Sequence, residues 1–458
     1  MEQKVELTKS LGLFGVVFLG LAWMTPMIFF TVYGVANEAA GGMLAAAYIV
    51  AFIAIFFTAY SYSRMVKAFP IAGSAYTYTK KAINPKIGFV VGWALLLDYI
   101  VSPIIAILTF GLFMNAQFPS IPVFVWIILL NIVLAVVNII GIKSVARVSG
   151  FSVLVQIVFI VFFLLFVIKD IIVGGNGLAL LSIQPFMSSD FSLSTVFAGA
   201  ALICFCFLGF DAVTTMAEET VDPKKTIPKA IFLIVIIAAI LYIAISYFTR
   251  IAYPDFSFHN ADTAAHELIL MVGGNLLSAI FTTVLIVATF TQGVSSVTSV
   301  TRFLFALGRE EILPKKVFAY IHPKFKTPVL NIVFITIISF LAIAIDLDMA
   351  VTFVSFGALT AFIFVNLSVI GHFYVKNKKR SFKETIMYLI LPLFGAGFIG
   401  WLLTLLEKQT LLIGIIWVLI GIFYVSIRAK VVSKPKTSLK KGKIVLENNQ
   451  GNQTGNKI

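Results

Sequence analysis

Long apolar segments follow one another along nearly the whole chain. Each is long enough to cross about 30 Å of hydrocarbon as a helix. Hydrophobic residues make up 60% of the chain and charged residues only 12%, which is not the composition of a soluble domain. The sequence therefore predicts an all-α membrane protein with twelve transmembrane helices. The predicted spans are residues 12–36, 42–66, 87–114, 122–141, 149–171, 195–217, 228–252, 270–300, 328–346, 350–373, 385–405 and 411–427.

Positive charge is distributed unevenly between the two sides of these spans. The chain has 34 Lys and Arg residues against 20 Asp and Glu, for a net charge of +14. If the N-terminus is cytoplasmic, only Lys169, Arg250 and Lys408 fall outside the cytoplasmic segments. This asymmetry is the positive-inside pattern of membrane proteins. We therefore expect a multi-pass protein of the plasma membrane with both termini in the cytoplasm, and no nucleic-acid partner.

An aspartate falls inside the sixth predicted span. Asp211 follows Gly209 and lies roughly 24 Å along a helix that starts near Thr195. A charge at this depth is costly, and such residues usually mark a substrate or ion path. Glycine allows the helix to break there and to offer bare backbone to a ligand. We expect Gly209 and Asp211 to bind the substrate.

The first predicted span also contains a helix-breaking residue. Pro26 follows Trp23, Met24 and Thr25 at mid-membrane, where proline removes a backbone hydrogen bond. Two interrupted helices five spans apart are typical of inverted-repeat transporters, in which the site lies between the breaks. A simple kink in each helix is the alternative. We favour a shared site, with residues 23–26 contributing to substrate binding.

Asp98 is a second carboxylate at membrane depth, roughly 16 Å into the third span. A protonated, hydrogen-bonded structural aspartate is one interpretation, and a cation or proton site is the other. No Lys or Arg falls near the middle of a predicted span to pair with either aspartate. Two carboxylates without a fixed cation favour a small cationic substrate, held also by packing and cation–π contact with aromatic residues. The candidates for that aromatic wall are Trp23, Tyr99, Phe205, Phe207 and Phe210.

Two glutamates follow the sixth span. Glu218 and Glu219 are either solvated loop residues or part of an inner gate that holds a basic residue such as Arg302 or Arg309. We retain Glu218, Glu219 and Arg302, together with Asp98, as coupling or gating candidates.

Other kinds of chemistry have little support in the sequence. Cys204 and Cys206 are two residues apart on a predicted helix and point in different directions, which argues against a disulfide. The four histidines have no spacing suited to a metal site with these thiols. No catalytic motif is present, so we expect no enzyme activity, no metal and no cofactor.

Three motifs, taken in order, resemble those of the amino acid–polyamine–organocation (APC) transporters. They are FPIAGSAYTY at residues 69–78, GFD with EETVDP and IP within residues 209–228, and TRFLFALGR with LP within residues 301–314. The resemblance covers nearly the whole chain. It implies a LeuT-type fold, a five-plus-five inverted repeat with helices 1 and 6 broken and two further C-terminal helices, and secondary active transport by alternating access.

On this resemblance the chain divides into five parts. We expect a cytoplasmic N-terminus at residues 1–11, five-helix repeats at 12–171 and 195–373, helices 11 and 12 within 385–427, and a basic cytoplasmic tail at 428–458, which its composition predicts to be disordered. A monomer is consistent with this scheme, and the oligomeric state stays open.

Within the superfamily the chain looks most like bacterial putrescine importers. The matching pieces are LAWMTPM at residues 21–27, VGW and LDY within 91–99, SIQPF at 182–186, and FGAL and FVNLS within 356–368. Amino acid carriers have a glycine-rich turn in helix 1 that binds the substrate carboxylate, whereas here Pro26 lacks an N–H donor. The cationic amino acid branch has a helix-5 lysine in place of sodium, whereas this chain has Gln156.

These observations predict a proton-coupled importer of putrescine or a similar small polyamine. Coupling is expected at Asp98 or Asp211, driven by the proton motive force, with sodium as the other possible ion. One alternative is a proton- or sodium-coupled amino acid symporter of the same superfamily. A channel or membrane sensor that does not accumulate substrate is another.

Overall fold

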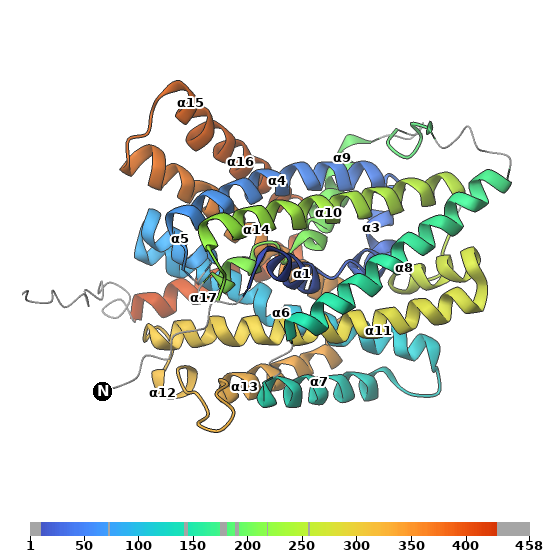
Figure 1. Cartoon of the computed structure of the whole chain (residues 1–458), viewed down its shortest axis with the longest axis horizontal. Coiled ribbons are helices and arrows are strands. Elements are labelled where there is room, and N and C mark those ends of the chain that lie inside the picture. The colour runs from blue at the N-terminus through green and yellow to red at the C-terminus, as the bar shows by residue number, and fades with distance from the viewer. Residues whose placement is uncertain are drawn as a thin grey trace, which may run out of the picture.

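The computed structural model describes residues 11–71, 74–141, 145–174, 181–187, 192–217, 219–254 and 257–427. These residues form helices joined by short turns, apart from one β-bridge between Leu11 and Thr220 (Figure 1). The helices are α1 (Leu13–Met24), α2 (Ile28–Thr31), α3 (Tyr33–Ala39), α4 (Leu44–Ala68), α5 (Ser74–Ala82), α6 (Pro85–Gln117), α7 (Val123–Ile140), α8 (Val145–Val173), α9 (Leu193–Ile203), α10 (Pro223–Ala252), α11 (Ala264–Arg309), α12 (Lys315–Phe318), α13 (Val329–Ser339), α14 (Leu347–Val369), α15 (Phe382–Thr385), α16 (Leu391–Thr404) and α17 (Lys408–Ile427).

Short 3₁₀ and π-helical turns extend several of these helices. The 3₁₀ turns are η2 (Cys204–Phe207), η3 (Ala212–Met216), η4 (Ala261–Thr263) and η5 (Phe340–Ile343). The π-helical turns are η6 (Ile370–Lys376) and η7 (Ile386–Ile390).

Most of the predicted spans correspond to helices of the structure. Within the described residues, 11 helical segments are long and apolar enough to cross a membrane. The ninth predicted span, residues 328–346, forms the shorter apolar helix Val329–Ile343. The all-helical membrane architecture is thus confirmed, while the count of twelve spans and the inverted repeat stay predictions.

The seventh span begins earlier than the sequence suggested. Residues 228–252 were expected, but α10 starts at Pro223 and contains Pro228. Pro223 is the better start, because a proline in the first helical position has the required φ and loses no intrahelical hydrogen bond.

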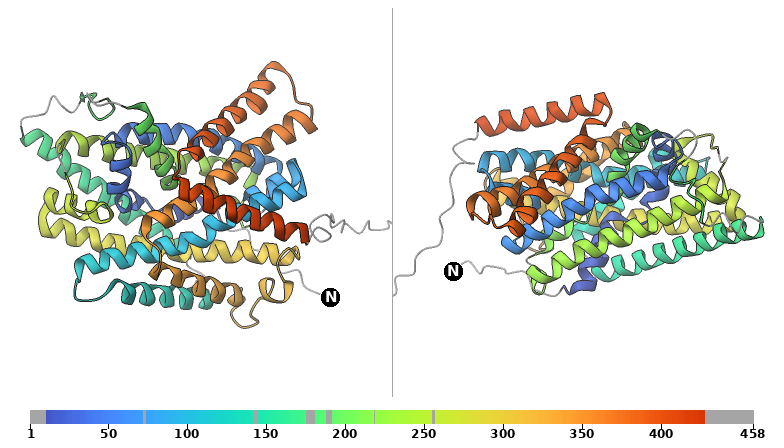
Figure 2. Two further views of the ribbon diagram at one scale, coloured as in Figure 1. Left: turned by 180° about the vertical axis from the view of Figure 1, so that it is seen from behind. Right: turned by 90° about the horizontal axis from the view of Figure 1, so that it is seen from above.

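The helices differ in how far the bundle covers them. The most apolar stretches of α6 and of the segment Leu193–Met216 are each 83% buried, whereas those of α7 and α17 are each 22% buried. Figure 2 shows α17 at the edge of the bundle. It is held to α6 by two indoles: Trp93 Nε1 donates to the Trp417 carbonyl at 3.0 Å, and Trp417 Nε1 donates to the Trp93 carbonyl at 2.7 Å.

Basic segments gather at one end of the molecule. This end carries α5 with Lys80 and Lys81, α12 with Lys315 and Lys316, and the last turn of α17 (Figure 1). We call it the basic end. Helix α3 lies toward the opposite end.

Candidate functional site

The first span is broken at the predicted position. Helix α1 ends at Met24, and the chain resumes as α2 at Ile28. Thr25 has φ 50° and ψ 108°, a conformation that β-branched residues rarely adopt. It precedes Pro26, and a residue before proline is disfavoured in the helical region. The Thr25-Pro26 pair therefore explains why the helix stops in the middle of the protein.

Side-chain hydrogen bonds close this first break. The Thr25 hydroxyl donates to Oε1 of Gln156 on α8 at 2.8 Å, and the Met27 backbone N–H donates to the same oxygen at 3.3 Å. Gln156 Nε2 in turn donates to the Ser152 hydroxyl at 3.1 Å. Gln156 is completely buried. The sequence singled out Gln156 only as a departure from related carriers, and its contact with the break was not predicted.

The sixth span is also broken where predicted. Helix α9 continues into η2, Leu208 is extended, and Gly209 has φ 115° before η3 begins at Ala212. A Cβ at residue 209 would lie 2.1 Å from Cδ1 of Trp23 and 2.9 Å from the Met24 nitrogen. Glycine is therefore required both for its φ and for space. The two breaks touch each other at this point.

The two predicted aspartates are the only charged side chains among the described residues that are buried, with Asp211 2% and Asp98 3% exposed. Asp211 Oδ1 accepts a long hydrogen bond of 3.4 Å from the Gly209 N–H, and its Oδ2 has no partner among the described residues. Asp98 Oδ1 accepts from the Ser102 hydroxyl at 3.1 Å. The two carboxylates lie within electrostatic range of one another. The breaks and the third span thus bring two acids together, and none of the described Lys or Arg residues is buried beside them.

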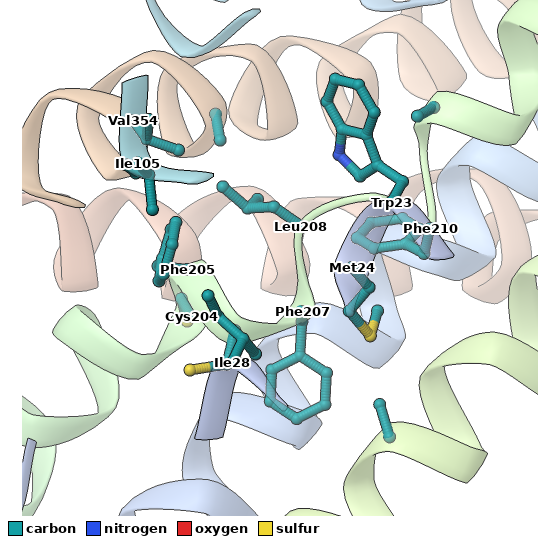
Figure 3. Packing of buried hydrophobic residues seen from close by; sticks show 14 of the residues in the cluster. Trp23, Met24, Ile28, Ile105, Cys204, Phe205, Phe207, Leu208, Phe210 and Val354 are labelled. Atoms are coloured by element: carbon teal, nitrogen blue, oxygen red, sulfur yellow. The ribbon is translucent and has the colours of Figure 1, made fainter. Parts of the chain in front are cut away.

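A small cavity lies between the broken helices. Its volume is about 10 Å³, the space of about one water molecule, so the site is closed in this conformation. Figure 3 shows Phe205 and Leu208 on the same side of the helix-6 break as Ile105 and Val354. The lining residues are Trp23, Met24, Ile28, Ser102, Phe205, Leu208, Gln292, Ser296 and Val354.

The predicted substrate residues divide into two groups. Trp23, Met24 and Phe205 line the cavity. The others flank it without lining it: Thr25, Pro26, Asp98, Tyr99, Phe207, Gly209, Phe210 and Asp211. Sequence reasoning missed the polar wall formed by Ser102, Gln292 and Ser296. Gln292 and Ser296 are four residues apart in an apolar span, which is a usable signal, because polar groups on one face of such a helix seldom face lipid.

Aromatic side chains pack on both sides of the helix-6 break. Phe207 packs edge-on against Tyr242, with ring centroids 5.6 Å apart. Phe210 packs against Tyr62 at 5.6 Å, and Trp23 against Tyr99 at the same separation. Phe207, Phe210 and Tyr99 thus belong to buried clusters around the cavity and do not form its wall.

Ion pairs join the helices at the basic end. Arg302 of α11 lies 3.1 Å from the Glu219 carboxylate, and Lys80 of α5 lies 2.6 Å from Glu310. Tyr76 also donates to Glu310, and burial together with that carboxylate raises the pKa of Tyr76, which keeps it a neutral donor. Glu218 lies outside the described residues. The structure brings Glu219 and Arg302 together, while their role as a gate stays a prediction.

The fold and the paired breaks define a membrane transporter, and the chain belongs to the amino acid permease family, which it matches over residues 15–438. It is 39% identical to the low-affinity putrescine importer PlaP of Escherichia coli (strain K12), over 94% of this chain and 96% of the importer. It is 28% identical to the branched-chain amino acid permease BcaP of Bacillus subtilis (strain 168), over 91% of this chain and 92% of the permease.

A solved structure shares the fold. It is the substrate-bound, outward-open state of a Na⁺-coupled sialic acid symporter, with a TM-score of 0.59 and 15% identity, over 86% of this chain and 89% of the symporter. At that identity the likeness concerns the fold alone, which is LeuT-type. The family and its members are transporters, so this chain is a multi-pass membrane transporter of the APC superfamily and not an enzyme.

Proposed function

We propose that this transporter imports putrescine or a related small polyamine, coupled to protons and by alternating access. The observation that carries the proposal is the pair of buried carboxylates, Asp98 and Asp211, beside a cavity that no buried Lys or Arg of the described residues approaches. A buried charge is retained at a cost and needs a partner of opposite sign. A protonated amine supplies that partner, and a proton neutralises the site when the amine leaves.

The first break has few free backbone N–H donors for a substrate carboxylate. The Thr25 N–H donates to Leu21, the Met27 N–H to Gln156 and the Ile28 N–H to Thr25. Pro26 has no N–H at all. An α-amino acid would therefore bring its carboxylate to a turn whose N–H donors are already used, close to two acids. A substrate with ammonium groups alone avoids both penalties.

The amino acid symporter is the second candidate. The 28% identity to a branched-chain amino acid permease over most of both chains favours it. Two observations favour a polyamine substrate: the 39% identity to PlaP, and a first break whose N–H groups are already hydrogen-bonded within the protein.

Uptake into proteoliposomes separates these candidates. We expect radiolabelled putrescine to accumulate when the outside is acidic, and a protonophore to abolish accumulation. Spermidine and cadaverine should compete, and leucine, lysine or arginine should not. Competition by the α-amino acids instead would identify an amino acid symporter. If accumulation depends on an imposed sodium gradient, sodium and not the proton is the coupling ion. Equilibration of putrescine without accumulation would indicate a channel.

The proposal includes an orientation and an inner gate. The positive-inside pattern supports a cytoplasmic location for the basic end, both termini and the Glu219–Arg302 pair of a plasma-membrane protein. The Glu219–Arg302 and Lys80–Glu310 pairs tie the end of helix 6 and α5 to the end of α11, so they hold the cytoplasmic side closed. They break when the substrate is released inward.

A further inference from the structure

Unpaired polar atoms gather on one side of the helix-6 break. The hydroxyls of Tyr62, Tyr78, Tyr99 and Ser74 are buried, as is Asp211 Oδ2, and none makes a hydrogen bond of normal geometry within the described part of the chain. Ser74 is a polar neighbour of Tyr62 and Tyr99, and Thr214 is one of Tyr78, but these contacts leave the carboxylate oxygen unpaired. Each of these side chains is at most 2% exposed. We call the three tyrosines with Ser74 the tyrosine cluster.

The cluster surrounds the Asp211 carboxylate. All three tyrosine hydroxyls lie within electrostatic range of Asp211. The Tyr62 and Tyr78 rings are 6.0 Å apart, and Tyr62 is 5.6 Å from Phe210, the neighbour of Asp211. These residues come from α4, α5, α6 and the sixth span, so four separate elements aim polar atoms at one place.

This is unusual for tyrosines in this protein. Elsewhere in the described core, tyrosine hydroxyls have partners: buried Tyr242 donates to the Cys206 carbonyl at 3.2 Å, and half-buried Tyr424 donates to the Ile312 carbonyl at 2.7 Å. A buried polar atom without a partner is destabilising, and native proteins contain few of them. Several in one place indicate a site that a polar ligand fills.

The cluster also adjoins the cavity. Trp23 lines the cavity and packs edge-on against Tyr99. On the other side, Ser102 lines the cavity and bonds Asp98. The cavity, with Trp23, Met24 and Leu208 in its apolar wall, therefore adjoins the cluster through Trp23 and Asp98 through Ser102.

We propose that the tyrosine cluster and Asp211 Oδ2 form a binding pocket for a primary ammonium group. The inference rests on the proposed function: one end of a diamine lies in this pocket, its methylene chain lies along the apolar wall, and its other end lies at Asp98 and Ser102. An ammonium group donates three hydrogen bonds, which the carboxylate and tyrosine oxygens accept. The cavity has to widen for the chain of the substrate to fit.

The test compares two amines that differ by one charge. Binding of 1,4-diaminobutane and of n-butylamine to the purified full-length protein is measured for wild type, Tyr62→Phe, Tyr78→Phe and Tyr99→Phe. Tyr424→Phe is the control, because it removes the hydroxyl of a half-buried tyrosine outside the cluster that already donates to the Ile312 carbonyl. We expect wild type and the control to prefer the diamine, and each cluster variant to lose about tenfold of that preference through weaker diamine binding alone.

The outcomes separate this proposal from the proposed function. In one contrary outcome, wild type prefers the diamine and the cluster variants either keep that preference or lose binding of both amines equally. The pocket then does not bind an ammonium group, and it contains water or contributes only to packing. If wild type binds α-amino acids and neither amine, the proposed function fails and this inference with it. Thermal unfolding of each variant identifies any that misfold, and the three tyrosine positions provide independent measurements.

Discussion

The two helix breaks at the centre of this transporter are built differently. The break in helix 1 is closed by protein: Gln156 accepts from Thr25 and Met27. The break in helix 6 is left open: Gly209 has positive φ, and Asp211 keeps one carboxylate oxygen without a partner among the described residues. Burial does not explain the contrast, since the two spans are 78% and 83% buried. The difference lies in hydrogen bonding, and on the function proposed above the first break serves as a structural joint and the second binds the ligand.

The largest expected effect is at the open break. Asp211→Asn keeps the size of the side chain and an acceptor for the Gly209 N–H, but it removes the charge. We expect uptake of putrescine to fall by at least about 100-fold, because the charge-assisted contact with the ammonium group is lost. Uptake is measured at equal amounts of protein in the membrane. Near-normal kinetics would contradict the central role of Asp211.

A smaller effect is expected at the closed break. Gln156→Leu leaves the Thr25 hydroxyl and the Met27 N–H unpaired, at a cost of about 1–3 kcal/mol for a buried group. We expect a lower thermal midpoint and an uptake rate reduced about tenfold.

The control for this variant is Asn138→Leu. Asn138 accepts from Thr298 and donates to Leu134, neither of which belongs to a break, so its loss lowers stability in a similar way. Uptake per folded molecule should change little in Asn138→Leu. If both variants reduce uptake equally, Gln156 contributes only to overall stability and has no specific role at the break in helix 1.

The smallest effect is expected where the two broken segments meet again at the basic end. Leu11, before α1, pairs its backbone with Glu219 and Val221, and Glu219 also holds Arg302. The pair is partly exposed, so Glu219→Gln should leave stability and expression nearly unchanged. We expect it to lower uptake about threefold by shifting the resting population toward the inward-open state.

Asp222→Asn is the matched control for the gate, because it also removes an exposed acid. Among the ion pairs of the described residues, Asp222 is paired only with Lys225, which belongs to the same helix. Unchanged uptake in Glu219→Gln would remove the gate from the mechanism.

The helix breaks and the two buried aspartates could be predicted from the sequence, because they depend on the properties of single residues. Pro26 and Gly209 mark the breaks by their own backbone preferences, and Asp98 and Asp211 stand out because charge is rare at membrane depth. The start of α10 was misplaced at Pro228, because two prolines five residues apart both fit the first turn of a helix.

The cavity wall could be predicted only in part. Ser102, Gln292 and Val354 come from three different helices, and which of their faces meet depends on packing across the bundle. The bond from Gln156 to Thr25 links residues 131 positions apart. Local pattern identifies polar residues in apolar spans, but their partners follow only from the assembled fold.

The contact between Gly209 and Trp23 has a consequence for the kinematics of transport. A Cβ at residue 209 would lie only 2.1 Å from the indole, so the glycine backbone of one broken segment packs directly on a side chain of the other. We expect a rotation of either segment to displace the other through this contact. If the proposed transport cycle holds, the two broken segments then move as one unit, and a ligand bound between them moves with both.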